Sequence, residues 1–184
     1  MSRSASRARA TRAAAFLLCV AVATLSGCAS LRQALSPAPR GAPSGREGWL
    51  VYTVHALRFE APAGWRASGG EQHLTLEAPD GAARVEISTP GTSYADEPAC
   101  LAGADEVLKR GAAFERMRRH PTRLAGVSAV TLEGDSGGWH VWAYAACDGG
   151  TQYRIFFTAR SPASAEAVEA YRTLVQTAKI GGQA

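Results

Sequence analysis

The stretch that decides the fold is WHVWAYAACDGGTQYRIFFTA, residues 139–159. It holds two runs rich in aromatic and β-branched residues, Trp139–Ala146 and Gln152–Ala159, and a Gly-Gly turn separates them. In both runs apolar side chains occupy successive positions, so they point to both faces of the strand. A strand with two apolar faces lies inside a sheet that is covered on both sides. The stretch therefore predicts two central strands with other elements packed above and below them.

Shorter strand patterns flank this stretch. Apolar or alternating runs predict strands at Trp49–Val54, Leu57–Glu60, His73–Ala78, Arg84–Ser88 and Val127–Glu133. Turn residues such as Pro79-Asp80-Gly81 separate neighbouring runs, as in antiparallel hairpins. No repeat or second linker interrupts residues 48–181, which we therefore assign to a single globular domain.

Two helix patterns occur among the strands. Pro98–Arg110 is bounded by an acidic capping residue, Asp96 or Glu97, and by Gly111 after its last turn. A second helical pattern opens at Ser161-Pro162 and ends at Gly181-Gly182. Together the elements predict an α+β fold, a mainly antiparallel β-sheet with helices packed on it.

Three segments of the domain carry a resemblance to a known family. Leu57–Trp65 is a strand followed by Pro-x-Gly-Trp, Leu124–Leu132 contains a Gly-x-x-Ala strand, and Tyr153–Ala159 precedes a closing helix to Ile180. In this order, over residues 49–180, they resemble the PsbP/Mog-like sandwich domains, which include the LpqN-like bacterial lipoproteins. The resemblance implies an α/β/α sandwich and a role in binding or assembly, because members of that superfamily share no catalytic residues.

The N-terminus has the organisation of an export signal with a lipid site. A basic segment without acidic residues, residues 1–12, precedes the thirteen-residue apolar run Ala13–Leu25. That run is too short to span a bilayer as a helix, which takes about 20 residues, and it fits a secretory signal. The motif Leu25-Ser26-Gly27-Cys28 then resembles a bacterial lipobox, whose cysteine is diacylated. The alternatives are a chance Leu-x-Gly-Cys in an ordinary signal peptide and an uncleaved membrane anchor.

The prediction for the N-terminal part is a signal peptide over residues 1–27, followed by a tether. Residues 28–47 are rich in Pro, Ala, Gly and Ser, which is typical of a flexible linker after the acylated Cys28. Ala29 follows that cysteine, so in a Gram-negative cell the periplasmic leaflet of the outer membrane is favoured. Two or three acyl chains hold a protein stably on a membrane. The chain is therefore expected to be tethered to the bacterial envelope.

The formal charge of +4 belongs to the predicted signal. Four arginines precede the apolar run, and without them 16 basic side chains face 16 acidic ones. The mature chain thus has no net charge to attract nucleic acid, and no nucleic-acid module is evident. Neither a cofactor nor a metal is expected, because His55, His73, His120 and His140 form no metal-ligand spacing. A metal site assembled from distant residues stays open.

Two cysteines remain in the domain, Cys100 and Cys147. A pair left over in an exported domain predicts a disulfide, since export delivers the chain to an oxidising compartment. Closing a loop of 47 residues would stabilise the fold by roughly 4 kcal/mol. The alternative is two buried free thiols.

The sequence Gly134-Asp-Ser-Gly-Gly138 matches the nucleophile motif of trypsin-like proteases. That chemistry also needs a histidine base, a buried aspartate and an oxyanion hole. No accompanying histidine segment occurs, and the motif lies between two strand patterns. It is therefore interpreted as a hairpin turn. Gly126–Val130 is one glycine short of a nucleophile elbow and lies within a strand pattern.

Arg116, Arg118, Arg119 and Arg123, together with His120, form the one basic cluster of the domain. One hypothesis is contact with an anionic surface such as lipid phosphate, which liposome flotation would test. The favoured alternative is a solvated edge strand whose charges prevent edge-to-edge pairing. The four tryptophans are expected mainly in the core. Their positions are Trp49, Trp65, Trp139 and Trp142.

Two functional hypotheses follow from these observations. The favoured one is a non-enzymatic, membrane-tethered envelope lipoprotein that binds a protein partner or a small ligand. The alternative is a small envelope enzyme of hydrolase type, with a site built from dispersed histidine and acidic residues. A pocket that holds two or more such residues within hydrogen-bond reach would favour the enzyme.

Overall fold

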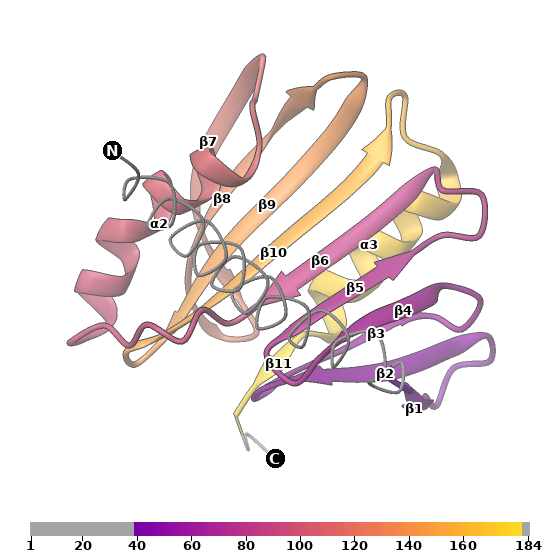
Figure 1. Cartoon of the computed structure of the whole chain (residues 1–184), viewed down its shortest axis with the longest axis horizontal. Coiled ribbons are helices and arrows are strands. Elements are labelled where there is room, and N and C mark those ends of the chain that lie inside the picture. The colour runs from indigo at the N-terminus through magenta and orange to yellow at the C-terminus, as the bar shows by residue number, and fades with distance from the viewer. Residues whose placement is uncertain (1–38, 182–184) are drawn as a thin grey trace, which may run out of the picture. The chain divides into compact units, whose positions relative to one another are not determined.

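Strands β9 (Trp139–Asp148) and β10 (Thr151–Arg160) form an antiparallel hairpin inside a seven-stranded sheet (Figure 1). The arrangement is that of a computed structural model, which describes residues 39–181. The strand order is β4-β5-β6-β10-β9-β8-β7, and each pair of neighbours is antiparallel. The other strands of this sheet are β4 (Arg66–Gly70), β5 (His73–Glu77), β6 (Ala83–Ser88), β7 (Arg116–Leu124) and β8 (Val127–Ser136).

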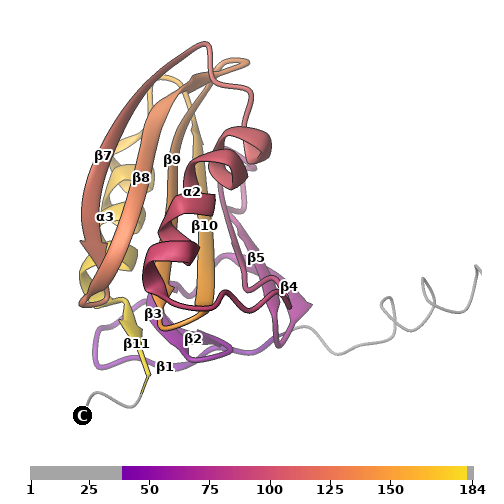
Figure 2. The same ribbon diagram turned by 90° about the vertical axis from the view of Figure 1, so that its left-hand side faces the viewer.

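A smaller sheet and two helices complete the layers. The small sheet has the order β1 (Ala42–Pro43), β2 (Trp49–Val54), β3 (Leu57–Pro62) and β11 (Lys179–Ile180). Helix α2 (Glu97–Gly111) packs on one face of the large sheet, and α3 (Ala165–Thr177) lies on the other face beside β3 (Figure 2). The predicted α+β fold, a mainly antiparallel sheet with helices packed on it, is confirmed.

Two hydrophobic cores lie on opposite faces of β9. Trp142 and Tyr144 point into the core that is shared with α3 and the small sheet. Val141, Ala143 and Ala145 point into the second core, beneath α2. Both faces of β9 are thus buried, because a pleated strand directs successive side chains to opposite sides and here every side chain from Val141 to Cys147 is buried.

Both helices begin at a capping side chain. The Asp96 carboxylate accepts a hydrogen bond of 2.8 Å from the Ala99 amide at the start of α2, as one of the two predicted caps. At α3 the cap is Ser164, whose hydroxyl accepts from the Ala167 amide. The second helix therefore starts at Ala165, later than the predicted opening at Ser161-Pro162, because Ser164 offers the nearest oxygen to its free amide groups.

Two strands of the large sheet, β4 and β7, lack the alternation of apolar and polar residues that predicts a strand from sequence. β4 was not expected as a strand, and it is held by pairing with β5 from Arg66↔Glu77 to Gly70↔His73. β7 contains the basic cluster and is the last strand of the sheet. Most of its residues are exposed. β7 is therefore a solvated edge strand, as the favoured interpretation of the basic cluster expected.

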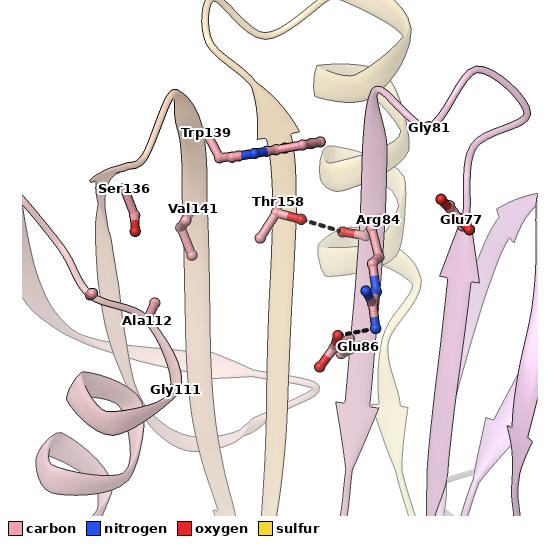
Figure 3. Close-up of a pocket in the computed structure, with 11 residues that line it drawn as sticks. Glu77, Gly81, Arg84, Glu86, Gly111, Ala112, Ser136, Trp139, Val141 and Thr158 are labelled. Atoms are coloured by element: carbon pink, nitrogen blue, oxygen red, sulfur yellow. Dashed lines mark hydrogen bonds and ion pairs between the residues drawn. The ribbon is translucent and has the colours of Figure 1, made fainter.

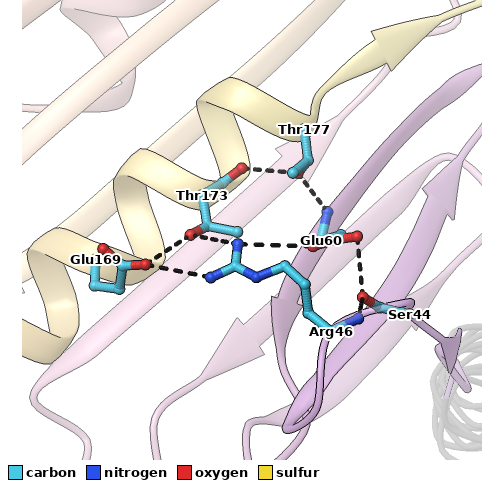
Figure 4. A network of polar contacts seen from close by, with 6 residues as sticks. All are labelled: Ser44, Arg46, Glu60, Glu169, Thr173 and Thr177. Carbon is cyan, nitrogen blue, oxygen red and sulfur yellow. Dashed lines mark hydrogen bonds and ion pairs between the residues drawn. The ribbon is translucent and has the colours of Figure 1, made fainter.

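The ordered domain begins before residue 48, inside the segment that was expected to be linker. Strand β1 pairs with β2 through Ala42↔Val51 and Pro43↔Leu50. The residues that follow β1 also form polar contacts with helix α3 (Figure 4). Arg46 lies 4.4 Å above the Trp49 ring and contacts α3 at Thr173 (3.2 Å) and Glu169 (3.4 Å). Composition predicted flexibility here, whereas tertiary contacts to α3 give these residues a fixed place.

Candidate functional site

The predicted lipid site lies outside the described residues. Cys28 and the three lipobox residues before it, Leu25, Ser26 and Gly27, precede residue 39. Within residues 39–181, no helix is both long and apolar enough to cross a membrane. Acylation of Cys28 therefore stays a prediction.

The predicted disulfide is present. Cys100 of α2 and Cys147 of β9 are bonded with an S–S distance of 1.99 Å, and both side chains are completely buried. The bond joins α2 to a central strand and so positions the helix on the face of the sheet.

The basic cluster divides between the two faces of β7. Arg118 forms an ion pair of 3.1 Å with Glu133 of β8, and Arg119 contacts Asp105 of α2 at 2.7 Å. Because side chains alternate along a strand, Arg116 shares the face of Arg118, and Arg123 shares that of Arg119. The four arginines do not form one patch, and two of them are paired with carboxylates. Binding to an anionic surface stays a prediction.

The strands bring one group of histidine and acidic residues together. The Nδ1 atom of His140 lies 2.9 Å from an Asp135 oxygen, and its Nε2 atom lies 3.3 Å from a Glu133 oxygen. Both ring nitrogens are thus engaged by carboxylates, so neither is directed at a nucleophile. Ser136 of the protease-like motif pairs with Trp139 at the β8–β9 turn, which confirms the hairpin. Across residues 39–181, no cluster of three or more such residues is arranged to hold a metal ion.

Two tyrosines lie deeper on the same face as His140. The hydroxyl groups of Tyr144 and Tyr171 are hydrogen-bonded to each other, and the Tyr171 ring stacks on Trp142 with centroids 4.4 Å apart. Burial raises the pKa of both phenols above the ordinary value of 10.0, and for Tyr171 the hydrogen bond with Tyr144 raises the pKa further. Both side chains are neutral at physiological pH. Tyr144 belongs to the core beneath α3, and Tyr171 of α3 is partly buried against it.

A groove opens on the α2 face of the large sheet, where α2 ends at Gly111 (Figure 3). The register of the strands builds its floor: Val141 lies opposite Thr158, which lies opposite Arg84, which lies opposite Glu77. Side chains that face one another in an antiparallel sheet are immediate neighbours. The Trp139 ring forms one wall of this part, whose volume is about 490 Å³. We call it the Trp139 end of the groove.

A second cavity of about 400 Å³ shares the lining residues Glu86 and Gly111 with the first, so the two lie side by side on the α2 face, and we describe them together as the groove. Its side chains come from α2 and from the strands β6 and β10. They are Glu86, Ser88, Val107, Arg110, Arg154 and Phe156. We call this part the Arg154 end. Each of the two volumes is in the range of small-molecule sites, about 300–1,000 Å³.

The charges at the Trp139 end compensate one another. Arg84 and Glu86 form an ion pair, and Glu77 lies 3.3 Å from Arg66. Among the described residues that line this end there is neither histidine nor cysteine. The end therefore offers paired charges, a hydroxyl group on Thr158 and an aromatic wall, which are features for binding a polar ligand.

Two further cavities lie at other places in the fold. One of about 420 Å³ separates Trp65 and Pro79 from the start of α3, and one of about 320 Å³ lies between Gly126 and Lys179. Neither contains a charged pair like that of the groove. Among the tryptophans, only Trp142 is buried, whereas Trp49, Trp65 and Trp139 are partly exposed. Trp65 packs against the core beside Trp142. The prediction that all four lie mainly in the core is thus wrong for Trp49, whose ring contacts Arg46, and for Trp139, which lines the groove.

Sequence reasoning missed the groove residues. Arg84 and Glu86 were recognised as the polar positions of an alternating strand, and Arg154 was placed inside an apolar run. No local signal distinguishes such residues from an ordinary solvated face. They meet because β6 pairs with β10, which follows it by more than 60 residues.

The sequence matches no family model and no curated protein. Among solved structures, the solution structure of the cyanobacterial PsbP protein CyanoP from Synechocystis is similar, with a TM-score of 0.53 and 11% identity over 77% of this chain and 98% of that one. A Bacteroides thetaiotaomicron protein has a TM-score of 0.48 and 12% identity over 70% of this chain, which spans 46% of that protein. The chain therefore has a PsbP-like fold, in agreement with the resemblance of its sequence.

Proposed function

We propose that this protein is a membrane-tethered lipoprotein of a bacterial envelope, whose domain binds a small polar ligand in the groove without transforming it. The observation that carries the proposal is the groove beside α2, with paired charges and an aromatic wall at one end. Its size suits a small molecule. The Leu25–Cys28 motif after an apolar run supports the tether.

Ligand binding is tested on the exported chain with Cys28→Ser, purified from the producing cell and examined by native mass spectrometry. Thr158→Trp fills the Trp139 end of the groove, while Thr53→Trp makes the same change at an exposed position of β2. A bound small-molecule mass in the parent and in Thr53→Trp, but absent from Thr158→Trp, supports the proposal.

Two results contradict ligand binding in the groove. One is a ligand mass that persists in Thr158→Trp, which places the ligand elsewhere. The other is the absence of any ligand mass, together with a stable complex with a second protein. That result favours a protein partner as the physiological ligand.

The tether is tested separately by mass spectrometry of the mature N-terminal peptide and by fractionation of the envelope. Diacylation of Cys28 and recovery with the membranes support it, and Cys28→Ser is expected to move the protein to the soluble fraction. An unmodified N-terminus after Gly27 or membrane recovery of Cys28→Ser contradicts it.

A further inference from the structure

We infer that the Arg154 end of the groove is a subsite for an anionic group, a carboxylate or a phosphate, of the ligand. The inference rests on the proposed function and adds the chemistry of one part of the ligand. The two ends of the groove differ in how their charged side chains are paired. At the Trp139 end each arginine or glutamate has a partner of opposite charge, whereas Arg110 and Arg154 have no carboxylate partner within residues 39–181.

The guanidinium group of Arg154 is held in one orientation by a buried side chain. Its Nε atom donates a hydrogen bond of 2.7 Å to Oε1 of Gln152. Gln152 is completely buried, and its Nε2 atom donates to the backbone oxygen of Cys100 at 3.2 Å. Because Nε is used in this way, the two terminal nitrogens of Arg154 remain for a ligand. In the described part of the chain neither of them has an acceptor.

The disulfide fixes the position of the Cys100 carbonyl group, which accepts the hydrogen bond from Gln152. Cys147 is the cross-strand neighbour of Gln152 and is bonded to Cys100, whose carbonyl group receives the Gln152 amide. Gln152 is therefore a positioning residue, and Arg154 is the residue that would contact the ligand. A pre-oriented guanidinium loses less conformational freedom on binding and can hold a planar carboxylate or a phosphate through two hydrogen bonds.

The surroundings suit an anion that is attached to an apolar group. Ser88 lies directly opposite Arg154 in the sheet and provides a hydroxyl donor. Phe156 and Val107 provide apolar surface beside it. Glu86 also lines this end, but its carboxylate is paired with Arg84. The C-terminal end of α2 carries a partial negative charge. Arg110 compensates this charge, since its Nε atom donates a hydrogen bond to the Glu106 carbonyl group.

The test uses three probes of similar shape, namely benzoate, phenyl phosphate and the neutral benzamide. Binding to the exported chain with Cys28→Ser is followed by amide NMR shifts around Phe156 and by titration. We expect benzoate or phenyl phosphate to bind at least about tenfold more tightly than benzamide, which corresponds to one charge-assisted hydrogen-bonded pair. The stronger of the two anions identifies a carboxylate or a phosphate as the recognised group.

Variants assign the effect to Arg154. Arg154→Gln is expected to abolish the preference for the anion, and Arg154→Lys to restore part of it, because lysine keeps the charge but not the planar fork. Arg172→Gln makes the same charge change on the exposed side of α3 and is expected to leave the preference unchanged. Gln152→Leu should lower the ratio of benzoate to benzamide affinity while leaving benzamide binding intact, which a merely structural role would not do.

The outcomes separate this inference from the proposed function. Equal affinities for benzoate and benzamide, no binding of either anion, or an equal loss in Arg154→Gln and Arg172→Gln overturn the anionic subsite. Ligand retention in the Thr158→Trp comparison does not depend on these probes. A ligand that is lost from Thr158→Trp but unaffected by Arg154→Gln thus supports the groove and rejects the subsite.

Discussion

At the scale of single residues, available space decides where glycine is required. A Cβ atom on Gly111 would meet the Phe156 ring, 2.6 Å from its Cε1 atom, and one on Gly134 would meet the backbone of β7, 2.9 Å from the Arg116 carbonyl carbon. The Phe156 ring is the end of a side chain and can shift without moving backbone. The backbone of β7 is held by pairing with β8 and yields less easily.

Gly134→Ala is therefore expected to destabilise the protein by about 1–3 kcal/mol, the usual cost of forcing extra atoms into a packed region. Denaturant unfolding measures the loss, and hydrogen exchange should show faster exchange in β7. Gly70→Ala, at a strand glycine with open space around it, is the control. Equal losses in the two variants would show that strand propensity, and not the contact with β7, sets the cost.

The Tyr144–Tyr171 pair predicts a loss of stability in alkali. Burial raises the pKa of both phenols above 10.0 in the folded protein, so the folded state keeps protons that the unfolded state releases. Their contribution to the free energy of unfolding is complete below about pH 10 and declines as the pH rises further. Urea unfolding between about pH 8 and 11 measures the decline.

Replacement of both residues, Tyr144→Phe with Tyr171→Phe, should make this decline shallower. It should not remove it, because burial also raises the pKa of Tyr52 and Tyr153. Parallel curves for the parent and the double variant would contradict the assignment.

At the scale of secondary-structure elements, α2 shapes the groove through where it lies and where it ends. Its buried residues Ala104 and Leu108 pack on β8 and β9, and β5 and β6 contribute residues to the groove beside the end of the helix. The helix is only weakly apolar, so its contacts with the sheet and the disulfide from Cys100 to β9 hold it in place.

Replacement of both bonded cysteines by alanine tests this dependence. The loop between them spans 47 residues, so Cys100→Ala with Cys147→Ala should lower the free energy of unfolding by about 3–4 kcal/mol. Thermal or urea unfolding of the parent, with and without reductant, provides the comparison. An unchanged unfolding free energy in the double variant would mean that packing alone positions α2.

At the scale of the whole molecule, residues near the start of the domain and the last helix are connected to each other. Arg46 contacts Glu169 and Thr173 on α3, which follow it by more than 120 residues, and lies 3.9 Å from the Glu60 carboxylate (Figure 4). The Oε2 atom of Glu60 is buried without a hydrogen-bond partner in the described part of the chain. Arg46 therefore compensates a partly buried charge as well as joining distant segments.

Arg46→Ala should for this reason cost more than an ordinary surface substitution, about 1–2 kcal/mol, because it leaves the Glu60 carboxylate without a cation. Hydrogen exchange of β1 and β2, together with urea unfolding, measures the effect. Arg66→Ala removes a comparable contact of 3.3 Å whose partners are 71% and 43% exposed, and it should cost less than about 1 kcal/mol. Equal costs would contradict the role assigned to Glu60.

The sequence by itself determined the features that depend on local chemistry. The two-faced strands at Trp139–Ala159, an acidic cap at Asp96 or Glu97 and the hairpin at Gly134–Gly138 all follow from side-chain period and from cap and turn preferences. The pairing of Cys100 with Cys147 followed from counting the cysteines that remain in the domain. The strand, cap and turn patterns depend on residues that are close together in the chain, and the two cysteines of the domain allow only one pairing. The structure confirms these predictions.

Only the tertiary structure decided where distant residues meet. β4 exists because β5 offers it hydrogen bonds, and residues 42–47 are ordered because Arg46 reaches α3. The groove needs the end of α2 beside the paired strands β5, β6, β10 and β9, and its residues have ordinary polar patterns in their own segments. Such a site arises when strands from distant parts of the chain pair with one another. The periodicity of side chains within one segment does not show which strands will pair, so the sequence predicted the fold but not the groove.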